Sequence, residues 1–131
     1  AESDETMLQI AMAVSKKIMK QSLAEDPAKF LPITKALIDQ VKSHPQITLL
    51  VSPAYYPLLV DNKDELSSIM AEQEKFRIYP SLELKGEQVI IETPFGRIDA
   101  SIDSQLEEVK NRLFHVMEEM IRENPNHSER D

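Results

Sequence analysis

The fold is decided by one stretch of the sequence, Glu92-Thr93-Pro94-Phe95-Gly96-Arg97-Ile98-Asp99-Ala100-Ser101-Ile102-Asp103-Ser104-Gln105-Leu106. The β-branched run 89–91 before it favours a buried strand. Pro94 cannot donate to a strand ladder, and Gly96 supplies the positive φ that a short hairpin loop usually needs. The following residues alternate between apolar and polar side chains, as in a half-buried strand, with apolar positions at Ile98, Ala100 and Ile102. The stretch therefore predicts a β-hairpin that runs directly into a helix.

A long helix is predicted after the hairpin, ending near Arg122. Its N-cap candidates are Ser101, Asp103 and Ser104, and Ser104 with Glu107 fits a capping box. Apolar residues then recur at helical spacing. We expect one set of them to face the sheet, namely Leu113, Val116 and Met120. A second set widens the apolar surface and is a candidate partner-binding face, with wider burial inside the domain as the alternative: Phe114, Met117 and Ile121.

The same stretch resembles the signature of a known family, the stators of flagellar export and type III secretion. The similarity is carried by Glu-Thr-x-x-Gly-x-Ile-Asp-Ala-Ser-Ile-x-x-Gln-Leu and covers roughly residues 7–113. Its structural motif falls on Gly96, Asp99, Ser101, Gln105 and Leu106. The family has a Gly-Gly-Cys step before the preceding strand, where this chain has Gly86-Glu87-Gln88. This departure favours a divergent secretion branch over a typical flagellar member.

The resemblance implies a scaffold protein without catalytic residues or cofactors. It implies a homodimer that binds the N-terminal region of the export ATPase, in the cytoplasm and peripheral to the inner-membrane secretion apparatus. A stalk before this domain is expected to reach a sorting-platform or C-ring protein. The chain begins Ala1-Glu2-Ser3, which we interpret as the start of an excised fragment because the family carries a long coiled coil there. The alternative is the related peripheral-stalk E subunit of a V/A-type ATPase.

The first predicted helix spans residues 4–24 and has an apolar side. Met7, Ile10 and Val14 lie on that side with further apolar residues at helical spacing. On general grounds such a stripe faces a core. The resemblance implies instead that these three side chains contact a second subunit.

A second predicted helix follows Asp26-Pro27, which fits an N-cap with proline at the first helical position. Pro32 leaves two possibilities, a helix that starts near Phe30 or one that kinks, because an interior proline removes a hydrogen bond. The helix is expected to end at Ser43-His44-Pro45. Its inward side is expected to hold Phe30, Ile33, Leu37, Ile38 and Val41.

The remaining segments predict an α/β fold, with a small mixed β-sheet of about four strands packed with N-terminal helices and the long C-terminal helix. The strand 47–51 is apolar on both faces and is placed centrally. Short helices at 54–60 and 64–73 connect it to a strand at 75–79, so these two strands should be parallel. The strand 88–93 forms an antiparallel hairpin with its successor. The predicted regions are 1–45 (helical, end of a stalk), 46–122 (globular core) and 123–131 (disordered tail).

Composition limits the possible functions. The 131 residues suit one domain, and the net charge of −8 lies entirely in residues 61–131. This acidic half disfavours nucleic acid and anionic lipid, and it suits a basic protein partner or a solvated surface. No apolar run is long enough to insert into a membrane.

Catalytic chemistry has little support in the sequence. The chain has no Cys and two Gly, so thiol nucleophiles, P-loops and dinucleotide motifs are excluded. Three isolated histidines give no zinc spacing. Asp99 and Asp103 are the one carboxylate pair near a structural corner. They allow a small metal-dependent enzyme as an alternative, although a structural role is favoured, with Asp99 accepting backbone hydrogen bonds.

Overall fold

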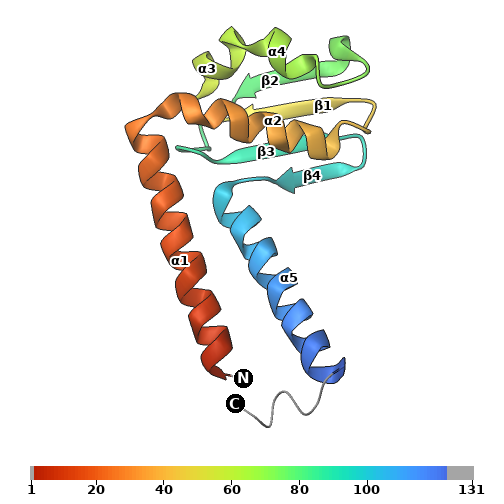
Figure 1. Cartoon of the computed structure of the whole chain (residues 1–131). Helices are drawn as coiled ribbons and strands as arrows, with labels where there is room; N and C mark the ends of the chain where they lie inside the picture. The colour runs from red at the N-terminus through yellow and green to blue at the C-terminus, as the bar shows by residue number, and fades with distance from the viewer. Residues whose placement is uncertain (1, 124–131) are drawn as a thin grey trace. The chain divides into compact units, whose positions relative to one another are not determined.

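The computed structural model describes residues 2–123, which form an α/β fold with a four-stranded mixed sheet and a long C-terminal helix, as predicted (Figure 1). The elements are α1 (Glu2–Glu25), the 3-10 helix η1 (Pro27–Lys29), α2 (Phe30–Val41), β1 (Ile47–Val51), α3 (Tyr56–Asp61), α4 (Lys63–Ser67), the 3-10 helix η2 (Gln73–Lys75), β2 (Phe76–Pro80), β3 (Val89–Thr93), β4 (Gly96–Asp99) and α5 (Ile102–Glu123).

The sheet has the strand order β2-β1-β3-β4. β1 pairs in parallel with β2, with Leu49 opposite Ile78, and antiparallel with β3, with Leu49 opposite Ile91. β3 and β4 form the antiparallel hairpin. The central place of β1, the parallel crossover through α3 and α4, and the antiparallel hairpin are all confirmed.

The two faces of the sheet differ in burial because side chains alternate along each strand. One face is buried and lies against α2, which crosses the sheet in Figure 1 and buries Phe30, Leu37 and Ile38. Its strand residues are Ile47, Leu49, Val51, Phe76, Ile78, Val89 and Ile91. The other face is half-buried or exposed and mixes polar with apolar side chains, namely Thr48, Leu50, Arg77, Tyr79, Ile90, Glu92, Arg97 and Asp99.

The start of α2 settles the question raised by Pro32. Asp26 Oδ1 accepts a hydrogen bond from Ala28 N at 3.2 Å and caps η1, and α2 begins at Phe30. Pro32 therefore lies in the first turn of α2, where a backbone N–H has no partner within the helix. Because no helical hydrogen bond is lost there, α2 tolerates the proline. The Phe30 ring stacks on Tyr55 with centroids 4.2 Å apart, which ties this turn to the segment before α3.

Two predicted boundaries are wrong. The helix predicted over 64–73 ends at Ser67, because the hydroxyls of Ser67 and Ser68 donate to Asp64 O and Glu65 O at the helix end. The capping box at Ser104 is also wrong, since α5 begins at Ile102 and Ser104 lies inside its first turn. Local side-chain hydrogen bonds outweighed helical periodicity in the first case, and an earlier helix start removed the cap in the second.

The described residues group into two compact units. Residues 2–20 and 103–123 form a helix-pair unit from most of α1 and α5, and residues 21–102 form a sheet unit. The division into 1–45, 46–122 and 123–131 stays a prediction, and residues 124–131 of the predicted tail lie outside the described residues. Among residues 2–123, no helix combines the length and hydropathy that crossing a membrane requires.

We predict that Leu49→Ala lowers the free energy of unfolding by about 2–5 kcal/mol, because Leu49 is fully buried at the centre of the sheet. Urea denaturation followed by circular dichroism measures the change. The matched control is Leu82→Ala, since Leu82 is 90% exposed and its truncation should change the free energy by less than about 0.5 kcal/mol. Equal losses in the two variants would contradict the assigned core.

Candidate protein-interaction surface

The corner between β4 and α5 is held by hydrogen bonds between polar side chains and the backbone. Asp99 Oδ1 accepts from Ser101 N at 3.0 Å, and Ser101 Oγ accepts from Val89 N at 3.1 Å. Ala100 N donates to Val89 O at 2.9 Å. Ser101 is buried, so its hydroxyl is shielded from competing water. These contacts give Asp99 and Ser101 a structural place in the fold.

The other motif residues lie on either side of this corner. Gly96 opens β4 with φ of 143°, a conformation that other residues rarely adopt. Thr93 Oγ1 accepts from Phe95 N at 3.1 Å and stiffens the turn before it. Gln105 and Leu106 are half-buried in the first turns of α5, and Leu106 lines a groove between α1 and α5.

That groove is too small for an ordinary ligand site. Its volume is about 230 Å³, below the roughly 300–1,000 Å³ of small-molecule pockets. Met12 and Leu106 supply apolar walls, and Lys16, Asp103 and Lys110 supply charge. The groove is better described as a gap in the packing between α1 and α5.

A charge cluster joins the two helices of the helix-pair unit. Asp103 accepts from both Lys16 Nζ and Lys20 Nζ, at 3.2 and 3.1 Å. Burial raises the pKa of Asp103, but the hydrogen bonds and charges of Lys20 and Lys16 outweigh burial and hold this pKa below its ordinary value. The cluster links residues more than 80 positions apart, so no local sequence pattern predicts it.

α1 carries an exposed apolar stripe, which contains the three predicted dimer-contact residues. The side chains of Met7, Ile10, Val14 and Ile18 are 51–68% exposed. Leu8, Met12 and Met19 on another side of the helix are half-buried. We call the exposed set the α1 stripe.

α5 also exposes apolar residues. Val109, Leu113, Val116 and Met120 are 39–57% exposed, and we call them the α5 stripe. Phe114, Met117 and Ile121 are half-buried on the adjoining part of the helix. The expectation that Leu113, Val116 and Met120 face the sheet stays a prediction, because α5 and the sheet belong to different compact units. The helix has a broad apolar arc, and within the helix-pair unit the part that includes Leu106 and Phe114 is the better covered one.

The α5 stripe has its own signal in the sequence. Its residues are spaced by four, three and four positions, the repeat of a helix-packing seam. Val109 and Ile18 were not named as contact residues, although both fit the spacing of their stripes. α5 thus has the α5 stripe beside its half-buried apolar residues. Two such sets on one helix are typical of a helix with two neighbours.

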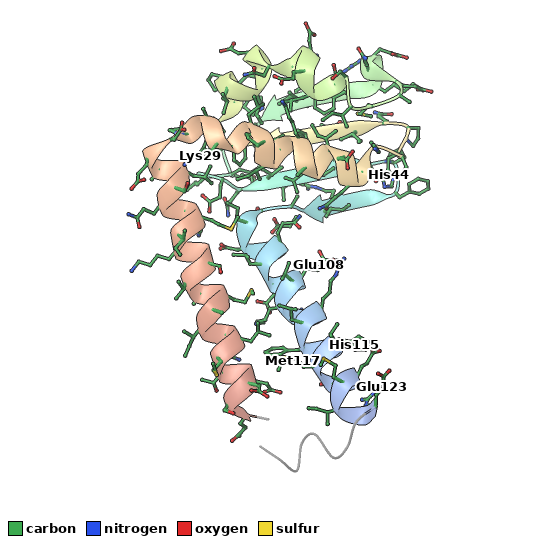
Figure 2. The ribbon with its side chains drawn as sticks, in the orientation of Figure 1. Lys29, His44, Glu108, His115, Met117 and Glu123 are labelled. Atoms are coloured by element: carbon green, nitrogen blue, oxygen red, sulfur yellow. The ribbon has the colours of Figure 1, made fainter. Side chains whose placement is uncertain are left out.

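The candidate catalytic and metal-binding side chains of the described residues make other contacts. No group of three or more His, Cys, Asp or Glu in residues 2–123 could hold a metal ion. Asp99 and Asp103 are each engaged as described above. His44 packs against Phe95 with ring centroids 5.8 Å apart, and His115 on α5 pairs with Glu119 at 3.1 Å (Figure 2). His127 lies outside the described residues.

Comparison with known proteins gives a consistent result. Residues 1–109 match the family model of the flagellar assembly protein FliH. The chain is similar to a Bacillus subtilis (strain 168) protein described as "Probable flagellar assembly protein FliH", with 32% identity over 117 residues. That match covers 89% of this chain and 56% of the relative, so the chain spans about half the length of the curated relative. The departure at Gly86-Glu87-Gln88 does not separate the chain from this group.

We predict that the pKa of Asp103 lies below its ordinary value. Asp103 then stabilises the fold only at a pH at which its carboxyl is ionised. Because its folded-state pKa is lowered, the contribution is fully present above the unfolded-state pKa, near 4, and is lost as pH falls through the folded value. The three side chains are 39–53% exposed, so the contribution is below about 1 kcal/mol.

Carbon-detected NMR titration of Asp103 measures this pKa directly. Replacing both lysines, Lys16→Gln and Lys20→Gln, should return the pKa of Asp103 to its ordinary value or above it, because burial then acts alone. Lys17→Gln is the matched control, since Lys17 lies on the same turn and has no contact with Asp103 among the ion pairs of α1 and α5 in residues 2–123. An unchanged pKa in the double variant would show that the cluster does not form.

Proposed function

From the premise that the chain belongs to the family of the flagellar assembly protein FliH, we propose that it is a non-enzymatic stator that binds, tethers and regulates an export ATPase. The proposed action is that of a static lever. A dimeric stalk positions the sheet unit and helix-pair unit against the ATPase and connects it to a sorting-platform or C-ring protein. The proposed location is cytoplasmic, peripheral to the inner-membrane export apparatus.

One observation carries this proposal: the helix-pair unit leaves two apolar stripes uncovered. No side chain of residues 2–20 or 103–123 is buried, while the sheet unit contains every buried apolar side chain of the described residues. Exposed apolar surface on this scale is typical of protein-interaction sites. The helix pair therefore presents binding surface on both of its helices.

We assign the α1 stripe to the homodimer. Met7, Ile10 and Val14 are continued along the helix by Ile18, which gives a seam of about three turns. Lys17 flanks the seam and can keep its charge in solvent while its aliphatic part covers apolar surface. A second copy of the same helix would bury this seam.

We assign the α5 stripe to the ATPase. Val116 and Met120 are its two most exposed members, and Phe114, Met117 and Ile121 continue the apolar arc as its half-buried inner margin. α5 carries six carboxylates and three Lys or Arg, so its surroundings are acidic. An amphipathic helix with basic residues beside its apolar side, in the N-terminal region of the ATPase, fits this surface.

The enzyme alternative has no comparable support. Asp103 is occupied by two lysines, and Asp99 accepts from the backbone. A carboxylate engaged in this way is poorly suited to bind a metal or transfer a proton. Both residues are better explained as parts of the fold.

We predict that Val116→Asp with Met120→Asp weakens binding of the export ATPase at least about tenfold and leaves the dimer intact, because a charge is placed at the centre of an apolar contact. Ile10→Asp with Val14→Asp should instead give a monomer. Calorimetric titration with the ATPase purified from the same organism measures affinity, and light scattering measures mass.

The control is Leu82→Asp, an apolar-to-acidic change at a 90% exposed position of the sheet unit, which should leave both properties unchanged. Circular dichroism verifies that each variant is folded. Wild-type affinity of the α5 variant would overturn the ATPase assignment. Capture of rotary-ATPase subunits in place of an export ATPase would support the peripheral-stalk alternative.

A further inference from the structure

β4 is the more accessible of the two edge strands of the sheet. The order β2-β1-β3-β4 leaves one side of β2 and one side of β4 without a strand neighbour among residues 2–123. β2 buries Phe76 and Ile78 and has α3 packed beside it, whereas every residue of β4 is exposed (Figure 1). An edge strand offers backbone N–H and C=O groups with which an added strand can pair.

The hydrogen-bond pattern fixes which backbone groups of β4 point outward. Ala100 N donates to Val89 O, so these residues form a hydrogen-bonded pair next to the ladder. Hydrogen-bonded and non-hydrogen-bonded pairs alternate in an antiparallel ladder. Ile91 and Ile98 are therefore hydrogen-bonded, while Glu92 and Arg97 are opposite each other without bonds. The N–H and C=O of Arg97 consequently point away from β3, toward the outer edge.

Two apolar side chains stand beside this edge. Phe95, in the turn before β4, is 82% exposed, and Ile98 is 44% exposed. The turn is stiffened by the Thr93 hydroxyl, and the Phe95 ring leans toward His44 at the end of α2. Ile98 is opposite Ile91, so it lies on the same face of the sheet as α2. A strand added to β4 would place a side chain against Ile98 and run past Phe95, on an edge that the sheet already holds in position.

On the opposite face of β4, the positive charge of Arg97 indicates which side chain a partner would place there. Arg97 lies across from Glu92, with Nε 3.7 Å from the carboxylate, and its side chain is 64% exposed. Opposite charges are favoured between directly paired residues of neighbouring strands. An added strand would therefore place an acidic side chain beside Arg97, and its two neighbours, on the other face, would lie opposite Gly96 and Ile98, with Phe95 at the end of the edge.

We propose that β4 is a docking edge for an extended segment of a partner protein, with the sequence pattern apolar–acidic–apolar and the acidic residue opposite Arg97. The segment adds a fifth strand, held by backbone hydrogen bonds to Arg97 and oriented by the flanking side chains. The site lies in the sheet unit and uses none of the stripe residues. The proposal for β4 therefore does not depend on ATPase binding by α5.

Hydrogen exchange tests the proposal. The probe is the peptide acetyl-Thr-Val-Glu-Val-Thr-amide, added to the isotope-labelled chain of residues 1–131. At a peptide concentration about nine times the Kd, exchange of the Arg97 N–H should slow about tenfold, because exchange then proceeds through the free tenth of the chain. The control peptide carries an N-methyl group on its Glu nitrogen and should give no protection, since it cannot donate to Arg97 O.

A charge exchange tests the assigned register. Arg97→Glu should weaken binding of the Glu peptide and favour its Lys counterpart, acetyl-Thr-Val-Lys-Val-Thr-amide, each by about threefold. Phe95→Ser should weaken both peptides equally. An unprotected Arg97 N–H, equal binding of the N-methylated peptide, or an unreversed charge preference would each overturn the proposal. Protection that rises with protein concentration without peptide would also overturn it, by assigning the edge to a second copy.

Discussion

The pairing of β1 on both of its sides is the constraint on which the rest of the structure depends. The run Ile47–Val51 is apolar except for Thr48, so it is stable only where both of its edges are bonded and one face is covered. β2 and β3 meet the first need and place Ile78 and Ile91 beside Leu49. α2 covers the buried face of the sheet. The helical crossover follows from this arrangement, because parallel β1 and β2 cannot be joined by a tight turn.

The corner after β4 converts the end of the sheet into the start of a helix by polar contacts alone. Ser101 serves two elements, since its hydroxyl accepts from Val89 N and its own N–H donates to Asp99. A hydrophobic residue at position 101 would leave the Val89 N–H buried without a partner, which costs about 1–3 kcal/mol. Asp99 and Ser101 therefore serve to pair backbone N–H groups at this corner, and this role explains both residues.

The sequence predicted what local patterns determine. The hairpin, the central strand and the long helix all have short-range signals, and all are present. The end of α4 was missed because serine hydroxyls compete with the helix backbone, an effect that periodicity does not report. The covered side of α5 was not predictable for another reason. A broad apolar arc does not say which part is covered, and its neighbour, α1, lies about 80 residues earlier in the chain.

The uneven distribution of buried side chains has a consequence for binding. The sheet unit holds the core, so its β4 edge and Phe95 belong to the part of the chain with buried apolar side chains. The helix-pair unit holds no buried side chain, and helices without a packed face derive little stability from tertiary contacts. A partner bound as proposed would cover the stripes and supply burial that these helices lack. Binding of that kind would be coupled to ordering, which lowers affinity for a given buried area and makes the contact easier to reverse.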